Sequence, residues 1–272
     1  MQKRVIISKN YAVAGVIEAL LLVALVSIVI STIQLVYIPQ IMEQREAEHM
    51  DDVSNQFSTL KSMIDLQAIT QSEAPISSLI TLGSRELPYF ITAKAFGEVL
   101  IEDSDDWNIN IDYGAFKYDL TSITFIAYNS YFVDQTYALE GGGILVKQTD
   151  GKSVMRADPS IAVVNGSDID IKFNLPIFIS YPSKNSTFGY GKCVIRTNYS
   201  EGDADLITTV DSINISTQYP NAWNESLHNF LGKNVNYEKG EKYVEITKKD
   251  KNIDLTIKYY YIYVQVGPGW IK

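Results

Sequence analysis

The sequence predicts an α+β protein in which a long N-terminal α-helix, transmembrane and then amphipathic, precedes an antiparallel β-sandwich-like ectodomain. Three observations lead to this fold class. Residues 19–38 form an almost unbroken apolar run, residues 40–68 carry apolar side chains at helical spacing, and segments after Ile76 alternate apolar and polar side chains as strands do. The predicted boundaries are a basic leader at 1–12, an apolar helix at 13–39, an amphipathic continuation at 40–72 and a β-rich domain at 73–272.

The apolar helix is long enough to cross a bilayer. Its strongly polar side chains are few, namely Glu18, Ser27, Ser31, Thr32 and Gln34. About twenty apolar residues at about 1.5 Å of rise span a hydrocarbon core of about 30 Å, and Pro39 is then expected to end or kink the helix. Because Lys3, Arg4 and Lys9 precede the run, the positive-inside rule predicts a cytoplasmic N-terminus and an extracellular C-terminal domain. Membrane lipid is therefore the first predicted partner. A cleaved secretory signal is a poorer match, since such signals have shorter apolar regions and end in an Ala-x-Ala site.

Glu18 is a carboxylate near the start of this apolar segment. A carboxylate in hydrocarbon is costly unless it is hydrated at the interface or paired with a cation. Two interpretations follow. Glu18 lies near the headgroups and stays hydrated, or it pairs with a positive charge on a neighbouring chain.

The segment after the apolar run has the pattern of an amphipathic helix. Its apolar side chains recur at spacings of three and four, at Met50, Val53, Phe57, Leu60 and Ile64. Acidic residues occupy the other positions: Glu43, Glu46, Glu48, Asp51 and Asp52. We expect the apolar stripe to pack on the chain's own β-domain, with an intersubunit coiled-coil seam as the alternative. The run 72–75, Ser-Glu-Ala-Pro, is expected to end the helix.

The β-rich domain is predicted from alternation and from turn residues. Residues 169–179 alternate Ile, Phe and Leu with Asp, Lys and Asn, which is typical of a half-buried strand. Asp150-Gly151 between 146–149 and 152–155 predicts a hairpin. A second hairpin is predicted from 243–247 and 253–259, which flank a Lys-Lys-Asp-Lys-Asn turn. Short strands joined in this way favour an antiparallel sandwich.

Composition excludes several classes of function. The net charge of −9 argues against nucleic acid as a partner, because phosphate binding needs Lys and Arg patches. The single Cys193 cannot form an internal disulfide, so we expect a buried small side chain or an intermolecular link. His49 and His228 have no nearby Cys or His with which to bind zinc.

Motifs for catalysis are also missing from the sequence. The run 140–143, Glu-Gly-Gly-Gly, is not followed by Lys-Ser/Thr, so it predicts a turn or bulge rather than a phosphate loop. No Gly-x-Ser-x-Gly or His-Glu-x-x-His occurs. We therefore predict no catalytic residue, no cofactor and no metal.

An acidic cluster is the nearest approach to a calcium site. It comprises Glu102, Asp103, Asp105, Asp106, Asn108 and Asp112. The cluster lacks the spacing and central Gly of an EF-hand, so a solvated loop is favoured over a calcium site.

Five Asn-x-Ser/Thr sequons lie in the C-terminal half of the chain. They are candidate glycosylation sites at Asn165, Asn185, Asn198, Asn214 and Asn224. Their confinement to one half fits an exported, glycosylated surface.

The residues from Ala12 to Ile17, Ala-Val-Ala-Gly-Val-Ile, followed by a helix of Leu, Val, Ile and Ala, resemble the N-terminus of archaeal type IV pilin-like proteins with a class III signal peptide. The family pattern is Ala-Val-Ser-Pro-Val-Ile-Gly, so this chain departs from it at Ala14, Gly15 and Glu18. The resemblance implies that a prepilin peptidase removes a basic leader, with the processing site at Ala12 and Val13. Cuts after Val13 or Gly15 are alternatives. A freed amine near Glu18 of a neighbouring subunit would then neutralise both charges in an apolar setting, a pairing that specifies geometry more than it stabilises.

A second resemblance covers residues 82–155. Leu-Gly-Ser, Ala95-Phe-Gly-Glu-Val-Leu and Ile123-Thr-Phe-Ile-Ala-Tyr-Asn129 occur there in the order seen in uncharacterised archaeal membrane-anchored ectodomains. Together the resemblances imply a pilin-like cell-surface structural protein, held by or assembled through its helix, with a filament or adhesion role. Its partners would be identical or related pilin-like subunits. The first alternative is a monomeric anchored ectodomain that binds an S-layer or other envelope protein, and the second is an anchored envelope enzyme.

Overall fold

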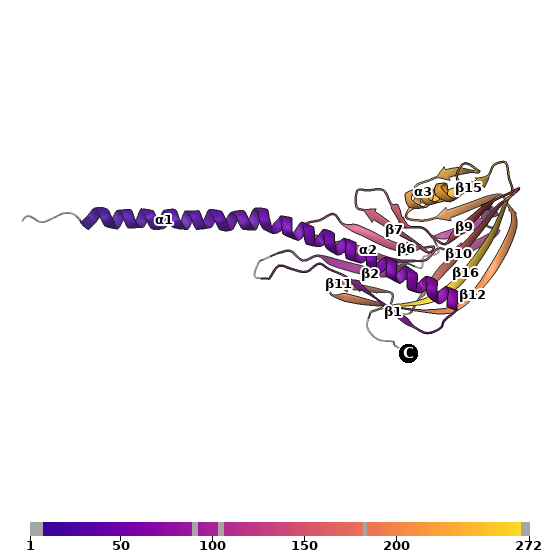
Figure 1. Cartoon of the computed structure of the whole chain (residues 1–272), viewed down its shortest axis with the longest axis horizontal. Helices are drawn as coiled ribbons and strands as arrows, with labels where there is room; N and C mark the ends of the chain where they lie inside the picture. Colours follow the sequence, from indigo (N-terminus) through magenta and orange to yellow (C-terminus); the bar gives the residue numbers. More distant parts are fainter. Residues whose placement is uncertain (1–7, 89–91, 103–105, 182–183, 268–272) are drawn as a thin grey trace, which may run out of the picture.

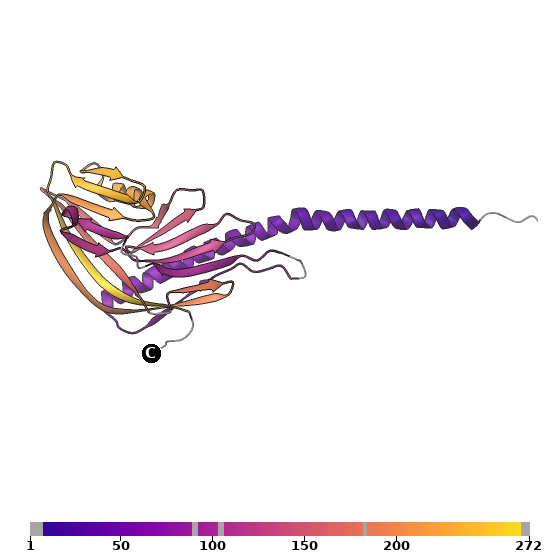
Figure 2. The same cartoon turned by 180° about the vertical axis from the view of Figure 1, so that it is seen from behind.

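The computed structural model describes residues 8–88, 92–102, 106–181 and 184–267, with side chains from residue 14 onward. The helical part consists of α1 (Ser8–Thr32), a π-helical turn (Ile33–Tyr37) and α2 (Ile38–Thr70). Figure 1 shows α1 projecting alone and α2 lying against a β-rich head. The view from behind in Figure 2 shows the same separation. The protein is therefore a long helix followed by a β-rich domain, an α+β architecture as predicted.

The helix does not end at Pro39. Pro39 lies in the first turn of α2, directly after the π-helical turn, so the helix continues through it although its missing N–H removes one backbone hydrogen bond. The irregularity falls earlier, in the π-helical turn, and Figure 1 shows the helix changing direction there. A π-turn widens the backbone spacing and is a common cause of helix bending. The helix ends at Thr70, and Gln71 takes the left-handed conformation just before the run 72–75.

Three sheets make up the head. The first has the order β1-β12-β16-β10-β9, the second β11-β2-β5-β6-β7-β8, and the third β14-β15-β13-β3-β4. The strands of the first sheet are β1 (Ile76–Thr81), β9 (Ile161–Asn165), β10 (Ile169–Ser180), β12 (Lys192–Val210) and β16 (Ile253–Val266). The strands of the second are β2 (Phe96–Glu102), β5 (Ser122–Tyr128), β6 (Gln135–Glu140), β7 (Gly143–Gln148), β8 (Val154–Ala157) and β11 (Ser186–Gly189). The strands of the third are β3 (Asn108–Ile111), β4 (Phe116–Asp119), β13 (Ser212–Ser216), β14 (Val235–Lys239) and β15 (Tyr243–Lys248). The turn Asp112–Gly114 and helix α3 (Pro220–Leu231) complete the described elements.

Strand pairing is mostly antiparallel. The exception is β10 with β16, which run parallel over their whole common length, from Ile169 beside Ile253 to Ser180 beside Val264. The predicted strand at 169–179 is confirmed as β10. The hairpin around Asp150-Gly151 is confirmed too, since Val146 pairs with Val154 across β7 and β8.

The second predicted hairpin is wrong. β15 pairs with β13 and β14, whereas β16 pairs with β10 and β12 in a different sheet. The Lys-Lys-Asp-Lys-Asn segment therefore connects two sheets. Helix α3 lies within the part predicted as strands, and its buried Trp223 and Leu227 pack into the head.

Two hydrophobic clusters form the core. One lies between the third sheet, α3 and the distal halves of β10 and β16. The other joins α2 to the second sheet and to β1, β12 and β16. The stripe residues Met50, Val53, Phe57, Leu60 and Ile64 all belong to this second cluster and are at most 2% exposed. In this structure the stripe is thus an internal packing surface of the chain's own head, and it leaves no coiled-coil seam at these positions.

Candidate functional site

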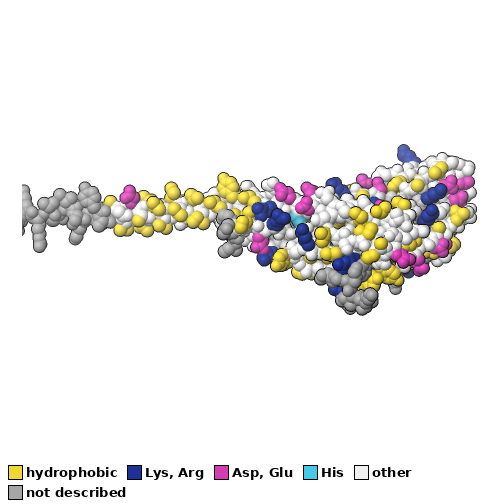
Figure 3. All heavy atoms as spheres, turned by 60° about the horizontal axis from the view of Figure 1, so that its bottom comes forward, with side chains coloured by type: hydrophobic (Ala, Val, Ile, Leu, Met, Phe, Trp, Pro, Cys, Tyr) yellow, Lys and Arg dark blue, Asp and Glu magenta, His cyan; other side chains and the backbone are white. Residues whose placement is uncertain are grey.

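The candidate anchor is the part of the helix before Ile38, whose apolar side chains face outward on all sides. The helical segment Ala14–Thr70 is long and apolar enough in its first part to cross a membrane. In its most apolar stretch, 18 residues long, no residue is buried. Figure 3 shows hydrophobic side chains along this part of the helix. Glu18 is exposed on it, while the side chains of Ala12 and Val13 lie outside the described residues. A helix that is apolar all round requires an apolar environment, either lipid or the packed helices of neighbouring subunits.

The anchor joins the head without a stalk. Tyr37 is 57% exposed, yet Ile38, the next residue, is 3% exposed and Met42 is fully buried. Contact with the head therefore begins at Ile38, directly after the helix segment that is exposed all round, although later apolar side chains of α2 such as Ile41, at 43%, also remain exposed. The head therefore begins close to the boundary of the lipid or of the packed helices that surround α1.

Glu46 fastens the helix to the head at this junction. It is fully buried, and its carboxylate accepts three backbone N–H groups from the loop between β5 and β6. Oε2 lies 2.7 Å from the nitrogens of Tyr131 and Phe132, and both oxygens lie 3.1 Å from the nitrogen of Ser130. Successive N–H groups converging on one carboxylate form an anion-binding concavity. We name this contact the Glu46 clasp.

Further polar contacts continue along α2. The Nε2 of His49 lies 2.8 Å from the Thr81 carbonyl oxygen, and burial lowers the pKa of this imidazole. Gln56 donates from Nε2 to Thr81 Oγ1 at 3.0 Å and accepts the Thr81 N–H at 2.8 Å. Gln67 donates to the Thr197 carbonyl at 2.9 Å and accepts the Thr197 hydroxyl at 2.8 Å. These contacts fix the rotation of α2 against β1 and β12, so head and helix are one packed unit.

A second buried carboxylate, Glu140, lies at the end of β6. It is 1% exposed, and its Oε1 accepts the Thr217 hydroxyl and the Trp223 indole N–H, each at 2.7 Å. Burial raises the pKa of Glu140 to about 7. Gly141 follows at φ +56°, and a Cβ there would lie 2.8 Å from the Trp223 ring, so both its conformation and its close packing favour glycine.

Glu102 is the carboxylate next to Glu140, and its charge adds to the rise in the Glu140 pKa. Its Oε2 accepts hydroxyls from Ser122 at 3.1 Å and Thr124 at 3.3 Å. Two carboxylates with unlike environments resemble the acid–base pairs of hydrolases. Here Glu140 is enclosed and already hydrogen-bonded, so the pair joins β6, α3 and the segment after β13 rather than facing a substrate. Among the described residues, no three His, Cys, Asp or Glu side chains gather as a metal site would require.

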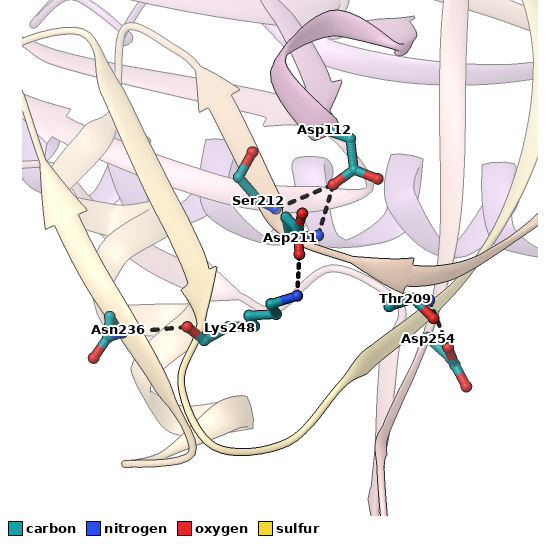
Figure 4. A network of polar contacts seen from close by, with 7 residues as sticks. All are labelled: Asp112, Thr209, Asp211, Ser212, Asn236, Lys248 and Asp254. Atoms are coloured by element: carbon teal, nitrogen blue, oxygen red, sulfur yellow. Dashed lines mark hydrogen bonds and ion pairs between the residues drawn. The ribbon is translucent and has the colours of Figure 1, made fainter.

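A polar network holds the distal end of the head, shown in Figure 4. Asp112 accepts the N–H groups of Asp211 at 2.7 Å and Ser212 at 3.2 Å, and Lys248 forms an ion pair with Asp211. Asp112 and the following Tyr113 both have positive φ, a conformation that this network holds in place. Asp112 thus serves an internal turn, while Asp103 and Asp105 of the predicted acidic cluster lie outside the described residues.

The other candidate residues are dispersed over the head. Cys193 is buried and free. His228 stacks on Tyr237, with 3.6 Å between ring centroids, and lies far from His49 in the sequence. Of the sequon asparagines, Asn165 and Asn185 are exposed, whereas Asn198, Asn214 and Asn224 are half-buried.

Sequence patterns missed the Glu46 clasp and the Glu140 pair. The available signal for Glu46 was its position four residues before Met50, which continues the spacing of the apolar stripe.

Comparison with known proteins bears on the whole chain. Among curated proteins and among solved structures, no match was found. One family model, DUF7289, described as a family of unknown function, matches residues 12–265. The match starts at the apolar helix and reaches the last strand, so anchor and head form one family unit. The chain therefore belongs to the DUF7289 family, whose function is unknown.

Proposed function

We propose that this protein is a pilin-like structural protein of the cell surface, held or assembled through its N-terminal helix, with a filament or adhesion role. The observation that carries the proposal is the division of one helix into two environments. Its first part exposes apolar side chains all round, and from Ile38 onward one face of the helix is buried against the head. The resemblance of residues 12–17 to the processing site of pilin-like proteins supports the same proposal.

The alternative is a monomeric anchored ectodomain that binds an S-layer or another envelope protein. The burial of the α2 stripe favours it in one respect, since those residues already have partners in the chain's own head. Under the filament proposal, intersubunit contacts must then come from α1 and from the surface of the head. In both cases we place the N-terminus in the cytoplasm and the head outside the cell, with glycans on the exposed Asn165 and Asn185.

The N-terminal peptide of the native protein tests the proposal. Mass spectrometry of membranes and of shed filaments is expected to find a chain that starts at Val13 or within a few residues of it. Such a start requires processing of the leader by a prepilin-type peptidase. An N-terminus at Met1 or Gln2 in both fractions would contradict assembly as a pilin and favour the monomeric ectodomain.

Glu18→Ala is expected to abolish or strongly reduce recovery of the protein in shed filaments. The reason is loss of the proposed charge pair between Glu18 and the amine of a neighbouring subunit, which sets the register of packed helices. The measurement is the ratio of filament to membrane protein by immunoblot. Glu43→Ala is the matched control, because Glu43 is an exposed carboxylate on the part of the helix attached to the head. Equal recovery of both variants would contradict the pairing.

A further inference from the structure

Three exposed aromatic side chains and the half-buried Phe96 form a surface on one side of the second sheet. They are Phe96 on β2, Tyr128 on β5, Phe188 on β11 and Tyr190 just after β11, and we call them the aromatic surface. Phe188 is 61% exposed and Tyr190 is 62% exposed. Phe96 stacks on Phe188 with 5.6 Å between centroids, while Tyr128 lies 5.9 Å from Phe188. The rings pack on one another and still present their outer faces to the surroundings.

Clustered, outward-facing aromatic rings mark a contact site. Single exposed apolar residues are ordinary, but a contiguous group on a folded surface is typical of an interaction with a partner or a membrane. On the face of the head that Figure 3 shows, hydrophobic side chains are interspersed among charged ones. The aromatic surface therefore needs an occupant.

A series of contacts connects the aromatic surface to the anchor. Arg45 on α2 donates from Nη1 to the carbonyl oxygens of Arg85 and Glu86, at 3.2 and 2.9 Å. Glu86 forms an ion pair with Lys94 at 2.9 Å, and the Lys94 ammonium lies 4.8 Å from the centre of the Tyr190 ring. In Figure 1, β2 and β11 lie in the part of the head that is nearer to α1. Their aromatic side chains thus belong to the anchor-proximal side of the head.

The height of this side above the membrane is small. Arg45 follows Tyr37 by eight residues, which is about 12 Å of helix. There is no stalk, because Ile38 is already enclosed by the head. Membrane helices tilt by about 20° on average, and a tilt toward β2 and β11 lowers that side of the head into the headgroup layer. The helix bends at Ile33–Tyr37, so the head lies off the axis of α1. A tilt of α1 therefore brings one side of the head closer to the membrane than the other.

We propose that the aromatic surface contacts the lipid headgroup layer and holds the head tilted down onto the membrane. The occupant is lipid because the surface is close to α1 and because of its side chains. Tyr is enriched at membrane–water interfaces, and Phe beside Lys is typical of segments that lie in the interface. Glu86 neutralises Lys94, and the chain carries a net charge of −9, so the contact depends on the rings and not on anionic lipid. Zwitterionic lipid should therefore suffice, with little dependence on salt.

This inference rests on the proposed membrane anchoring, and the test separates the two. The full chain, with Cys193→Ala, is reconstituted in phosphatidylcholine vesicles that carry a spin label on the lipid headgroup. A fluorophore is attached to Ser186→Cys, an exposed position two residues before Phe188 on β11 that leaves the four rings in place, or to Leu206→Cys as the matched control. Leu206 is also an exposed strand residue, 70% exposed, on the distal half of β12. A third probe at Leu25→Cys, with a spin label in the acyl chains, reports insertion of α1.

We expect the headgroup label to quench the probe at position 186 several-fold more than the probe at 206, equally at low and high salt. Quenching at Leu25 without quenching at 186 would overturn the aromatic contact while leaving the anchor intact. Absence of quenching at Leu25 would contradict the anchoring itself. Shielding of the probe at 186 that grows with protein density and is insensitive to the headgroup label would assign the surface to a second copy of the chain, which also overturns the proposal.

Discussion

Glu46→Ala is expected to lower the free energy of unfolding of the head by about 3 kcal/mol, because three backbone N–H groups lose a charged acceptor. The loss should concentrate at the junction of anchor and head, since the loop between β5 and β6 is held to α2 by this carboxylate. The measurement is urea unfolding of the full chain in detergent micelles, followed by far-UV circular dichroism and by the emission of its three tryptophans, of which Trp223 is fully buried.

Glu48→Ala is the matched control for this prediction. Glu48 lies two residues further along the same helix, is exposed, and accepts one hydrogen bond from Gln44. Its loss should cost less than about 0.5 kcal/mol, as expected for exposed pairs on a helix. Glu46→Gln should fall between the two alanine variants, because the amide keeps one acceptor oxygen but turns a second donor toward the N–H groups. An effect of Glu46→Ala no larger than that of Glu48→Ala would show that water replaces the carboxylate at no cost.

The clasp also determines what the anchor can do to the head. Because Ile38 and Glu46 are both enclosed, a rotation or tilt of α1 cannot be absorbed by a flexible linker. The nearest irregular element is the π-helical turn at Ile33–Tyr37, just before the head begins. Under the proposed function, a force on α1 is expected to pass through α2 to the second sheet. This is a suitable construction for a structural surface protein, and it gives the Glu46 clasp its proposed importance.

The helical part could be predicted because its information is local. The apolar run gives α1, and the three-and-four spacing from Met50 to Ile64 gives the buried face of α2. Residue type misled at one position, where the periodicity was right. Glu46 was assigned to the polar face by residue type, although its spacing places it on the buried face, and the structure buries it completely. Spacing and residue type disagree at Glu46 because its hydrogen-bond partners are backbone N–H groups of a loop more than 80 residues away. No pattern in the sequence indicates these partners.

The sheets could be predicted only in part because their pairing is not local. β10 and the hairpin of β7 and β8 follow from alternation and from an Asp-Gly turn. The parallel pairing of β10 with β16 joins Ile169 to Ile253, and nothing near either residue indicates the other. The wrong hairpin has the same origin, since β16 finds partners on both sides in another sheet. Glu140 belongs here too. Its partners Thr217 and Trp223 are 77 and 83 residues away, so the sequence shows only a turn beginning with Glu.

Burial of Glu140 has a consequence for stability that can be measured. Its pKa is about 7 in the folded protein, above the ordinary value of 4.5, so the folded state binds more protons than the unfolded state between these pH values. The free energy of unfolding contributed by this group is therefore highest below pH 4.5, falls as the pH rises to about 7, and is level above it. The gap of 2.5 between the two pKa values corresponds to a fall of about 3 kcal/mol.

Glu140→Gln should remove this fall and make the head more stable than the wild type at pH 8, by up to about 3 kcal/mol. Glutamine keeps an oxygen that can accept from Thr217 and Trp223, but it carries no charge to be desolvated. Urea unfolding of both proteins from pH 4 to pH 8 measures the difference. Glu241→Gln is the control, because Glu241 is exposed and its substitution should leave the slope unchanged. Glu102→Gln is a second test. Loss of the neighbouring charge should lower the pKa of Glu140, so the free energy of unfolding should fall less between acidic and neutral pH than in the wild type. If the wild type and Glu140→Gln show the same slope, Glu140 is solvated in the folded protein, and the enclosed packing of Trp223 over Gly141 is then not the solution structure.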